Sequence, residues 1–253
     1  MKRSFIPIKK FTEEPYSKIL GYPKATKTQI KSRIIEIQKL GIKSISLSGT
    51  TSIGKLSILG KGYVGVVVLG KRREKHVAVK IRRTDSQRME MKSEAKMLNV
   101  VNSVNVGPKL VGASRNFMVM EFLDGQKIGD WIENLQGKGA VKELKSVISS
   151  VLEDCYKLDQ IGFDHGELSS ISKHVIVGKS KSVLIDFESS STERRVSNVT
   201  SATQAIFIGS GIARKVHKLY RLPSKELVIE TLRTYKQEPS RKNFEDILKI
   251  LKL

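Results

Sequence analysis

The apolar residues of this chain follow two different periods. From about residue 53 to 83 they form short runs or alternate with polar residues, which is typical of β-strands. The stretches 57–59, 66–69 and 76–81 are predicted as three strands, and 117–120 as a fourth. After Gly125 the apolar residues recur at helical spacing, above all on a stripe from Leu144 to Leu158 that Gly162 ends.

Further elements follow from the same patterns. A helix capped at 84–86 is predicted to run to about 101, and apolar runs at 175–177 and 183–185 predict two more strands. Three helices are expected over about 208–221, 225–236 and 241–252, the last two capped by Ser224 and Ser240. A strand-rich half followed by a helical half predicts an α+β fold of two lobes with a cleft between them.

The first fifty residues carry a pattern of their own. Apolar residues from Ile30 to Leu40 recur at helical spacing, so a helix is predicted over about 28–40, with Thr28 as its N-cap and Gly41 as its stop. A strand is expected over 42–47. A helix followed by a strand is compatible with half of a winged-helix module, but an extension packed on the next lobe is favoured.

Composition limits the setting. Apolar residues make up 39% and charged residues 28%, as in ordinary globular proteins. The single cysteine, Cys155, excludes an internal disulfide and suits a reducing compartment. No apolar run approaches the ~20 residues that span a membrane, and the first residues lack the apolar stretch of a signal peptide. A soluble, cytoplasmic protein without a membrane partner is therefore expected.

The net charge changes this picture. Forty-six Lys and Arg against 25 Asp and Glu give +21, a field that attracts polyanions. A solvated lysine-rich surface is the simpler interpretation, but such surfaces usually carry matching glutamates. RNA or a ribonucleoprotein is therefore favoured as a neighbour, although no motif for reading RNA sequence is present.

Residues 60–67 (GKGYVGVV) fit the pattern G-x-G-x-x-G-x-V. Glycines in a strand–turn–strand let backbone N–H groups approach phosphates without an intervening Cβ. A glycine-rich hairpin by itself needs no ligand. A dinucleotide-binding fold would continue into a helix, whereas here a valine strand follows.

Residues 77–80 (VAVK) place Lys80 at the end of an apolar strand, where an ammonium needs an anionic neighbour. ATP phosphates and a helix glutamate would supply one. Glu94 is the preferred glutamate and Glu90 the alternative. Residues 118–125 then indicate a buried strand and a linker whose backbone meets adenine, with Asp124 or Asp130 near the ribose.

The order DHGEL at 164–168, a short hairpin and then Asp186 suggests a catalytic loop and a metal-binding aspartate. Phosphate transfer needs one carboxylate to orient the acceptor hydroxyl and another to hold Mg²⁺. Glu167 and Asp186 are the candidates.

Together these motifs, over about residues 57–190, resemble the eukaryotic-type protein kinase superfamily. More narrowly, HGELS at 165–169, DFE at 186–188 and NVT at 198–200 resemble archaeal predicted serine/threonine kinases akin to RIO kinases and to the kinase of the KEOPS complex. The resemblance implies a strand-rich lobe over 51–123, a shortened helical lobe over 124–253, and residues 1–50 as a basic extension. It also implies an ATP site lined by Gly60, Lys61, Gly62, Gly65, Val67, Ala78, Lys80, Glu94, Met120, Glu121 and Leu123.

The departures from the kinase pattern concern the catalytic loop. Glu167 stands where kinases usually have aspartate, and the second metal ligand, usually asparagine, would be Ser172 or His174, with Glu188 a further possibility. An imidazole is an unusual ligand for Mg²⁺. The expected activity is transfer of the γ-phosphate of Mg-ATP to a serine or threonine of the protein itself or a dedicated protein partner, or to water. A pseudokinase scaffold in ribosome or tRNA processing is the alternative, and a small-molecule kinase is a third.

Overall fold

The computed structural model describes residues 4–209, 211–221 and 223–253. The fold is α+β, as the sequence predicts, and it divides into two compact units. The strand-rich unit comprises described residues 4–99 and 108–123, and the helical unit comprises 100–107 and the described part of 124–253. The separation of residues 1–50 as a domain of their own stays a prediction.

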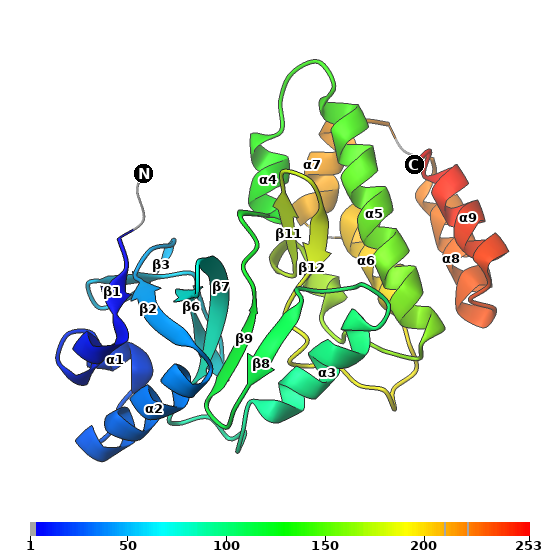
Figure 1. The fold of residues 1–253 in the computed structure, drawn as a ribbon. Coiled ribbons are helices and arrows are strands. Elements are labelled where there is room, and N and C mark those ends of the chain that lie inside the picture. The colour runs from blue at the N-terminus through cyan, green and yellow to red at the C-terminus, as the bar shows by residue number, and fades with distance from the viewer. Residues whose placement is uncertain (1–3, 210, 222) are drawn as a thin grey trace. The chain divides into compact units, whose positions relative to one another are not determined.

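The strand-rich unit is built around a seven-stranded antiparallel sheet of order β1-β2-β6-β7-β9-β8, with β5 paired to β6 (Figure 1). The strands of the whole strand-rich unit are β1 (Ile6–Pro7), β2 (Ile42–Ser46), β3 (Thr51–Ile53), β4 (Leu56–Ile58), β5 (Gly60–Lys61), β6 (Gly65–Arg72), β7 (Lys75–Arg82), β8 (Leu110–Ala113) and β9 (Phe117–Glu121). Its helices are the 3₁₀ helix η1 (Ile8–Thr12), α1 (Ser17–Leu20), α2 (Lys27–Lys39) and α3 (Lys92–Asn102), which continues past residue 99.

The two faces of this sheet differ because side chains alternate along each strand. Val66, Val68 and Val79 lie in one buried cluster with Phe11 and Ile37 of the N-terminal segment. Their direct neighbours in sequence, Val67 on β6 and Ala78 and Lys80 on β7, belong to the other face. The N-terminal segment therefore covers one face of the sheet and, through β2, extends it, which confirms the prediction of a packed extension.

Helix α2 begins earlier than predicted. Thr26, and not Thr28, is its N-cap: the Thr26 hydroxyl accepts from Gln29 N at 3.2 Å, and the Gln29 side chain accepts from Thr26 N at 2.8 Å. This reciprocal capping box satisfies two amide groups that an N-cap at Thr28 would leave open. The T-x-x-Q spacing at 26–29 was the overlooked signal.

Helix α3 begins later than predicted, at Lys92 rather than after a cap at 84–86. The preceding residues are held by other bonds: Arg83 forms a bidentate ion pair with Asp85, and Met91 N donates to Arg115 O at 2.9 Å. The first helical bond therefore runs from Ala95 N to Met91 O. Local side-chain bonds of this kind compete with a helix turn.

Asn116 links α2 to the sheet. Its Oδ1 accepts from Arg33 at 3.1 Å and from Arg82 at 3.0 and 3.1 Å, while its N and Nδ2 both donate to the Glu36 carboxylate at 2.7 Å. Burial, followed by the Arg82 charge, lowers the pKa of Arg33 to about 10. Arg33 also donates to the carbonyl of Leu20. Asn116 thus accepts hydrogen bonds from two guanidinium groups and donates two to one carboxylate.

The helical unit carries a three-stranded antiparallel sheet, β10-β11-β12, beside its helices (Figure 1). The strands are β10 (Gly125–Lys127), β11 (Val175–Gly178) and β12 (Ser182–Leu184). The helices are α4 (Ile128–Asn134), α5 (Ala140–Gln160), the 3₁₀ helix η2 (Leu168–Lys173), α6 (Asn198–Gln204), the π-helix η3 (Ala205–Gly209), α7 (Gly211–Leu219), α8 (Lys225–Gln237) and α9 (Arg241–Ile250).

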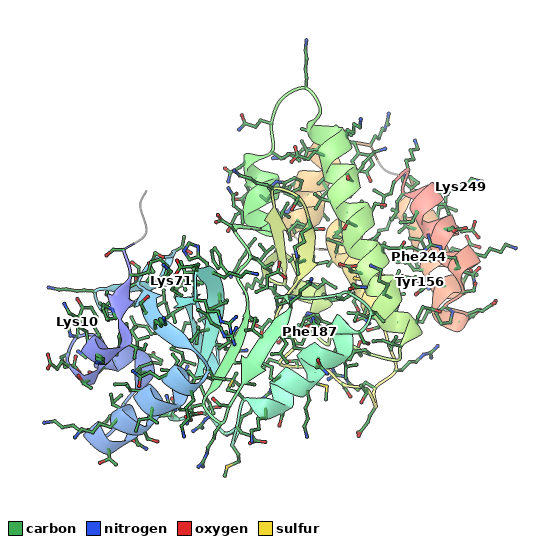
Figure 2. All side chains as sticks on the ribbon, in the orientation of Figure 1. Lys10, Lys71, Tyr156, Phe187, Phe244 and Lys249 are labelled. Atoms are coloured by element: carbon green, nitrogen blue, oxygen red, sulfur yellow. The ribbon has the colours of Figure 1, made fainter. Side chains whose placement is uncertain are left out.

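The last two helices follow the prediction. Ser224 accepts from Leu227 N, and Ser240 accepts from Asn243 N, so both predicted caps are confirmed. Tyr156 of α5 stacks on Phe244 of α9 with ring centroids 4.6 Å apart (Figure 2). The helix predicted over 208–221 is shorter, as α7, and its residue 210 lies outside the described residues. Helix α6 was not predicted.

Among the residues that the structure describes, no helix is both long and apolar enough to traverse a lipid bilayer.

Replacing Asn116 with alanine removes the shared acceptor of Arg33 and Arg82 and both donors to Glu36. We expect the free energy of unfolding to fall by about 2 kcal/mol or more, because partly buried charged groups lose their partners. Urea denaturation followed by circular dichroism measures this. As a control, Asn134→Ala, at an exposed position, should change it by less than about 0.5 kcal/mol. Equal effects of both substitutions would contradict the linking role of Asn116.

Candidate functional site

Lys80 lies in the middle of central strand β7, opposite Val67 of β6 and Met118 of β9. Its side chain is 6% exposed, and its Nζ donates to Oε1 of Glu94, which is 3% exposed, at 2.6 Å. Of the two candidate glutamates, Glu94 in the first turn of α3 is thus the partner, while Glu90 precedes the helix. A buried ammonium requires such a partner, because desolvation of an unpaired charge is strongly unfavourable.

The glycine-rich segment forms a hairpin between β5 and β6, closed by a hydrogen bond from Gly62 N to Gly65 O at 2.8 Å. A Cβ on Gly65 would lie 2.8 Å from the carbonyl oxygen of Ile81 and 3.1 Å from Cγ of Lys80, so only glycine fits there. A Cβ on Gly60 would meet nothing within 4 Å. The hairpin therefore packs tightly on β7 at Gly65 and leaves open space at Gly60, as close approach of a ligand to the backbone requires.

Tyr22 of the N-terminal segment supports this hairpin. Its ring lies 5.4 Å from Nζ of Lys61 and 5.2 Å from the guanidinium carbon of Arg83, and Lys61 also donates to its hydroxyl at 3.3 Å. Arg83 in turn donates to the carbonyl of Gly62 at 3.2 Å. Cation–π contacts of this kind are worth about 0.5–1 kcal/mol when exposed. The position of the glycine hairpin thus depends on the N-terminal segment.

The remaining candidate ATP residues of this unit follow the strand register. Ala78 stands opposite Met120 of β9 and shares the face of Lys80, while Val67 stands opposite Lys80 itself. Glu121 donates its N–H to the carbonyl of Lys109 at 2.8 Å. Leu123 ends the unit. The strand register thus places Val67, Ala78 and Met120 on the same face of the sheet as Lys80.

In the helical unit, Glu167, His174 and Asp186 come together. One ligand atom of each lies within 4.8 Å of the others. The hairpin causes this: Val175 of β11 pairs with Leu184 of β12, and Ile185 N donates to His174 O at 2.9 Å, so Asp186 follows directly beside His174. Asp186 has φ +67°, a left-handed conformation that is uncommon outside glycine and often marks functional sites.

His165 lies behind this group, fully buried. Its Nε2 is 3.1 Å from the carbonyl oxygen of Ile185, and its ring contacts His174 edge to face with centroids 5.4 Å apart. Burial, with the neighbouring His174 as a second cause, lowers the pKa of His165 to about 4. A neutral ring donating from Nε2 therefore fixes the backbone before Asp186.

Ser172 lies in η2, where its Cβ would be 3.1 Å from a Cβ on Gly129 of α4. Its role as the second metal ligand stays a prediction, and so does that of Glu188.

Asn198 of α6 holds the loop that contains His165 and Glu167. Its Oδ1 accepts from His165 N at 2.8 Å, and its Nδ2 donates to Phe163 O at 2.6 Å and to Asp159 Oδ1 at 2.8 Å. Asp159 of α5 also accepts from the first amides of α6, those of Asn198 and Val199. Tyr235 of α8 donates to the same carboxylate at 2.9 Å. The residues that this network joins are 33 or more positions apart, so no local pattern reveals it.

A cavity of about 330 Å³ opens beside the loop, lined by residues that include Gly166, Leu168, Arg194 and Arg195. Arg194 bonds Asp164 at 3.0 Å and Ser189 O at 2.5 Å. A Cβ on Gly166 would lie 2.5 Å from Nη2 of Arg194, so glycine is needed in the loop for Arg194 to occupy this place.

The family model described as protein tyrosine and serine/threonine kinase matches residues 53–206. The chain belongs to this kinase family. The matched residues include the glycine hairpin, the Lys80–Glu94 pair, the group of Glu167, His174 and Asp186, and Asn198. This kinase is also similar to the uncharacterized protein MJ1211 of Methanocaldococcus jannaschii, at 26% identity over 99 residues, which cover 39% of this chain and 81% of that protein.

Asn198→Ala removes the side-chain acceptor of His165 N and two donors within the loop network. We expect a loss of about 3 kcal/mol in the free energy of unfolding, because Asp159 and the Phe163 carbonyl stay buried with fewer donors. Hydrogen exchange by mass spectrometry should show faster exchange in peptides containing His165. Ser201→Ala, which removes a hydroxyl bonded to Ser197 on the same helix, is the control. Unchanged exchange at the loop in Asn198→Ala would contradict this role.

Proposed function

We propose that the protein is an atypical serine/threonine kinase, or kinase-like ATPase, that transfers the γ-phosphate of ATP to itself, to a dedicated protein partner or to water. The observation that carries the proposal is the buried Lys80–Glu94 ion pair. Burial of an ammonium on an apolar sheet face is energetically unfavourable, so its presence suggests a function. Binding the phosphates of ATP is such a function.

The residues of the strand-rich unit fit ATP. Open space at Gly60 lets the phosphates approach the hairpin backbone, while Lys80 supplies the positive charge. Val67, Ala78 and Met120 offer an apolar surface on the face of Lys80 for the adenine ring, and the backbone over 121–123 follows at its edge. Lys61 would be near the phosphates, and it is held by Tyr22.

A divalent cation fits the helical unit; kinases in general use Mg²⁺. Glu167, His174 and Asp186 would hold it, since their ligand atoms are close enough for one ion. The cation would neutralise charge on the phosphates.

In the transfer step, the acceptor oxygen forms a bond to the γ-phosphorus as the bond to the β–γ bridging oxygen breaks, and ADP leaves. Glu167 would orient the acceptor hydroxyl and take its proton through the carboxylate oxygen that does not hold the cation. Gly166 and Leu168, on either side of Glu167, line the 330 Å³ cavity, which is therefore the proposed entry for the acceptor. Arg194 and Arg195 line the same cavity and would contact acidic groups of the partner.

The finer type is proposed to be RIO-like or KEOPS-like. The DFE sequence at 186–188 and the HGELS loop support this. Work near RNA or a ribonucleoprotein is supported by the net charge of +21 and by the basic β6–β7 hairpin, where Lys71 lies (Figure 2).

Lys80→Met and Asp186→Ala should each reduce phosphate transfer from radiolabelled ATP at least 100-fold, since one removes the phosphate-binding charge and the other a cation ligand. Lys75→Met, on the exposed start of the same strand, should leave the rate within about twofold. Because Lys80→Met leaves Glu94 buried without its partner, melting curves must show that each variant is folded. Wild-type turnover in Asp186→Ala would overturn the mechanism. ATP binding without turnover in the wild type would favour a pseudokinase scaffold instead.

RNA binding should weaken steeply with salt, because each neutralised phosphate releases counterions. Changing both Lys71 and Lys75 to glutamine should flatten the slope of log K against log salt by up to about 2. The matched control changes Lys242 and Lys249, which removes the same charge from the helical unit. Filter binding to a mixed RNA pool measures both slopes. No detectable binding at low salt would remove RNA from the proposal.

A further inference from the structure

The group of Glu167, His174 and Asp186 differs from an all-oxygen cation site in one donor. It presents two carboxylates and one imidazole, with ligand atoms within 4.8 Å of one another. Mg²⁺ prefers an octahedron of oxygen ligands and binds nitrogen poorly. An imidazole at this place therefore bears directly on which cation the site selects.

His174 is fixed in place by its backbone. Its N–H donates to Ile171 O at 3.0 Å, and its carbonyl accepts from Ile185 N at 2.9 Å. These bonds hold the residue at the point where η2 ends and the β11–β12 hairpin begins. The backbone therefore places the side chain of His174 beside Asp186.

The ring of His174 is buried but unsatisfied. Its side chain is 10% exposed, its Nδ1 has no hydrogen-bond partner among the described residues, and its Nε2 is 3.7 Å from Oε2 of Glu167, beyond hydrogen-bond length. Buried polar groups in folded proteins are nearly always paired, yet neither ring nitrogen of His174 has a hydrogen bond among the described residues. A cation bound beside Glu167 would satisfy one of these two nitrogens.

The two carboxylates limit the choice of partner. They bring negative charge to the ring, which excludes an anion and favours a metal ion that accepts both oxygen and nitrogen. Among divalent ions, those of the first transition row bind imidazole better than Mg²⁺ does. Mn²⁺ in addition accepts carboxylate and phosphate oxygens as Mg²⁺ does.

We infer that Glu167, His174 and Asp186 form a site that selects Mn²⁺ over Mg²⁺, with His174 as the residue that determines the selectivity. The inference rests on the proposed phosphate transfer only for the use of the cation. The site itself rests on the three donors and on the ring of His174, which has no hydrogen bond among the described residues.

The first test is direct binding of each metal to the purified full chain, by isothermal calorimetry with Mn²⁺ and Mg²⁺ separately. Wild type should bind Mn²⁺ at least about tenfold more tightly than Mg²⁺. In His174→Asn, which restores an oxygen donor, this ratio should fall at least about fivefold, mainly through weaker Mn²⁺ binding. His76→Asn, in the strand-rich unit, is the matched control and should keep the wild-type ratio.

A second measurement needs no variant. Pulsed electron paramagnetic resonance of Mn²⁺ bound to wild type at substoichiometric metal should show ¹⁴N coupling from a histidine nitrogen. Equal affinities for the two metals, an unchanged ratio in a folded His174→Asn, or the absence of ¹⁴N coupling would each overturn the inference.

The outcomes also separate the site from the proposed function. Mn²⁺ selectivity with ¹⁴N coupling but no phosphate transfer would leave the site intact and remove the kinase activity. Phosphate transfer supported equally by both metals, without ¹⁴N coupling, would leave the activity and remove the Mn²⁺ site.

Discussion

The ion pair between Lys80 and Glu94 is the interaction on which the strand-rich unit is organised. Both groups are almost fully buried, so each charge is stabilised there by the other. Removing one partner of such a pair typically costs about 3–5 kcal/mol, whereas an apolar pair of the same size is often no less stable. Stability alone therefore does not explain the pair, and this is why a role in binding an anion is proposed for it.

The segments around Lys80 and Glu94 are arranged so that the two side chains meet. Glu94 reaches Lys80 because α3 begins at Lys92, after a segment whose own ion pair and backbone bonds keep it out of the helix. Gly65 has no room for a side chain beside Cγ of Lys80. On the opposite face, the N-terminal segment fills the core, and its Tyr22 contacts Lys61 of the glycine hairpin. One segment thus completes the sheet and supports its glycine hairpin.

In the helical unit, three candidate cation ligands are brought together by a loop and a hairpin. Glu167 comes from a loop, His174 and Asp186 from the two ends of a hairpin, and no regular element holds all three. Asn198 and Asp159 anchor the loop, and Asp159 at the same time caps α6. Glu167 and His174, which depart from the usual kinase residues, therefore lie in segments held by several hydrogen bonds, so their difference from the kinase pattern is in side-chain chemistry.

Much of this protein follows from its sequence, because local patterns carry local information. The period of apolar residues located the main strands and helices, and the order of glycines, Lys80, Glu94, Glu167 and Asp186 indicated the fold and the candidate chemistry. The sequence left open which glutamate pairs with Lys80. It gave no sign that Tyr22 supports the glycine hairpin or that Asn198 holds the loop through Asp159. Those contacts join residues 14 to 61 positions apart. Only the tertiary structure brings such residues within bonding distance, since their meeting depends on strand register and helix packing that no single segment encodes.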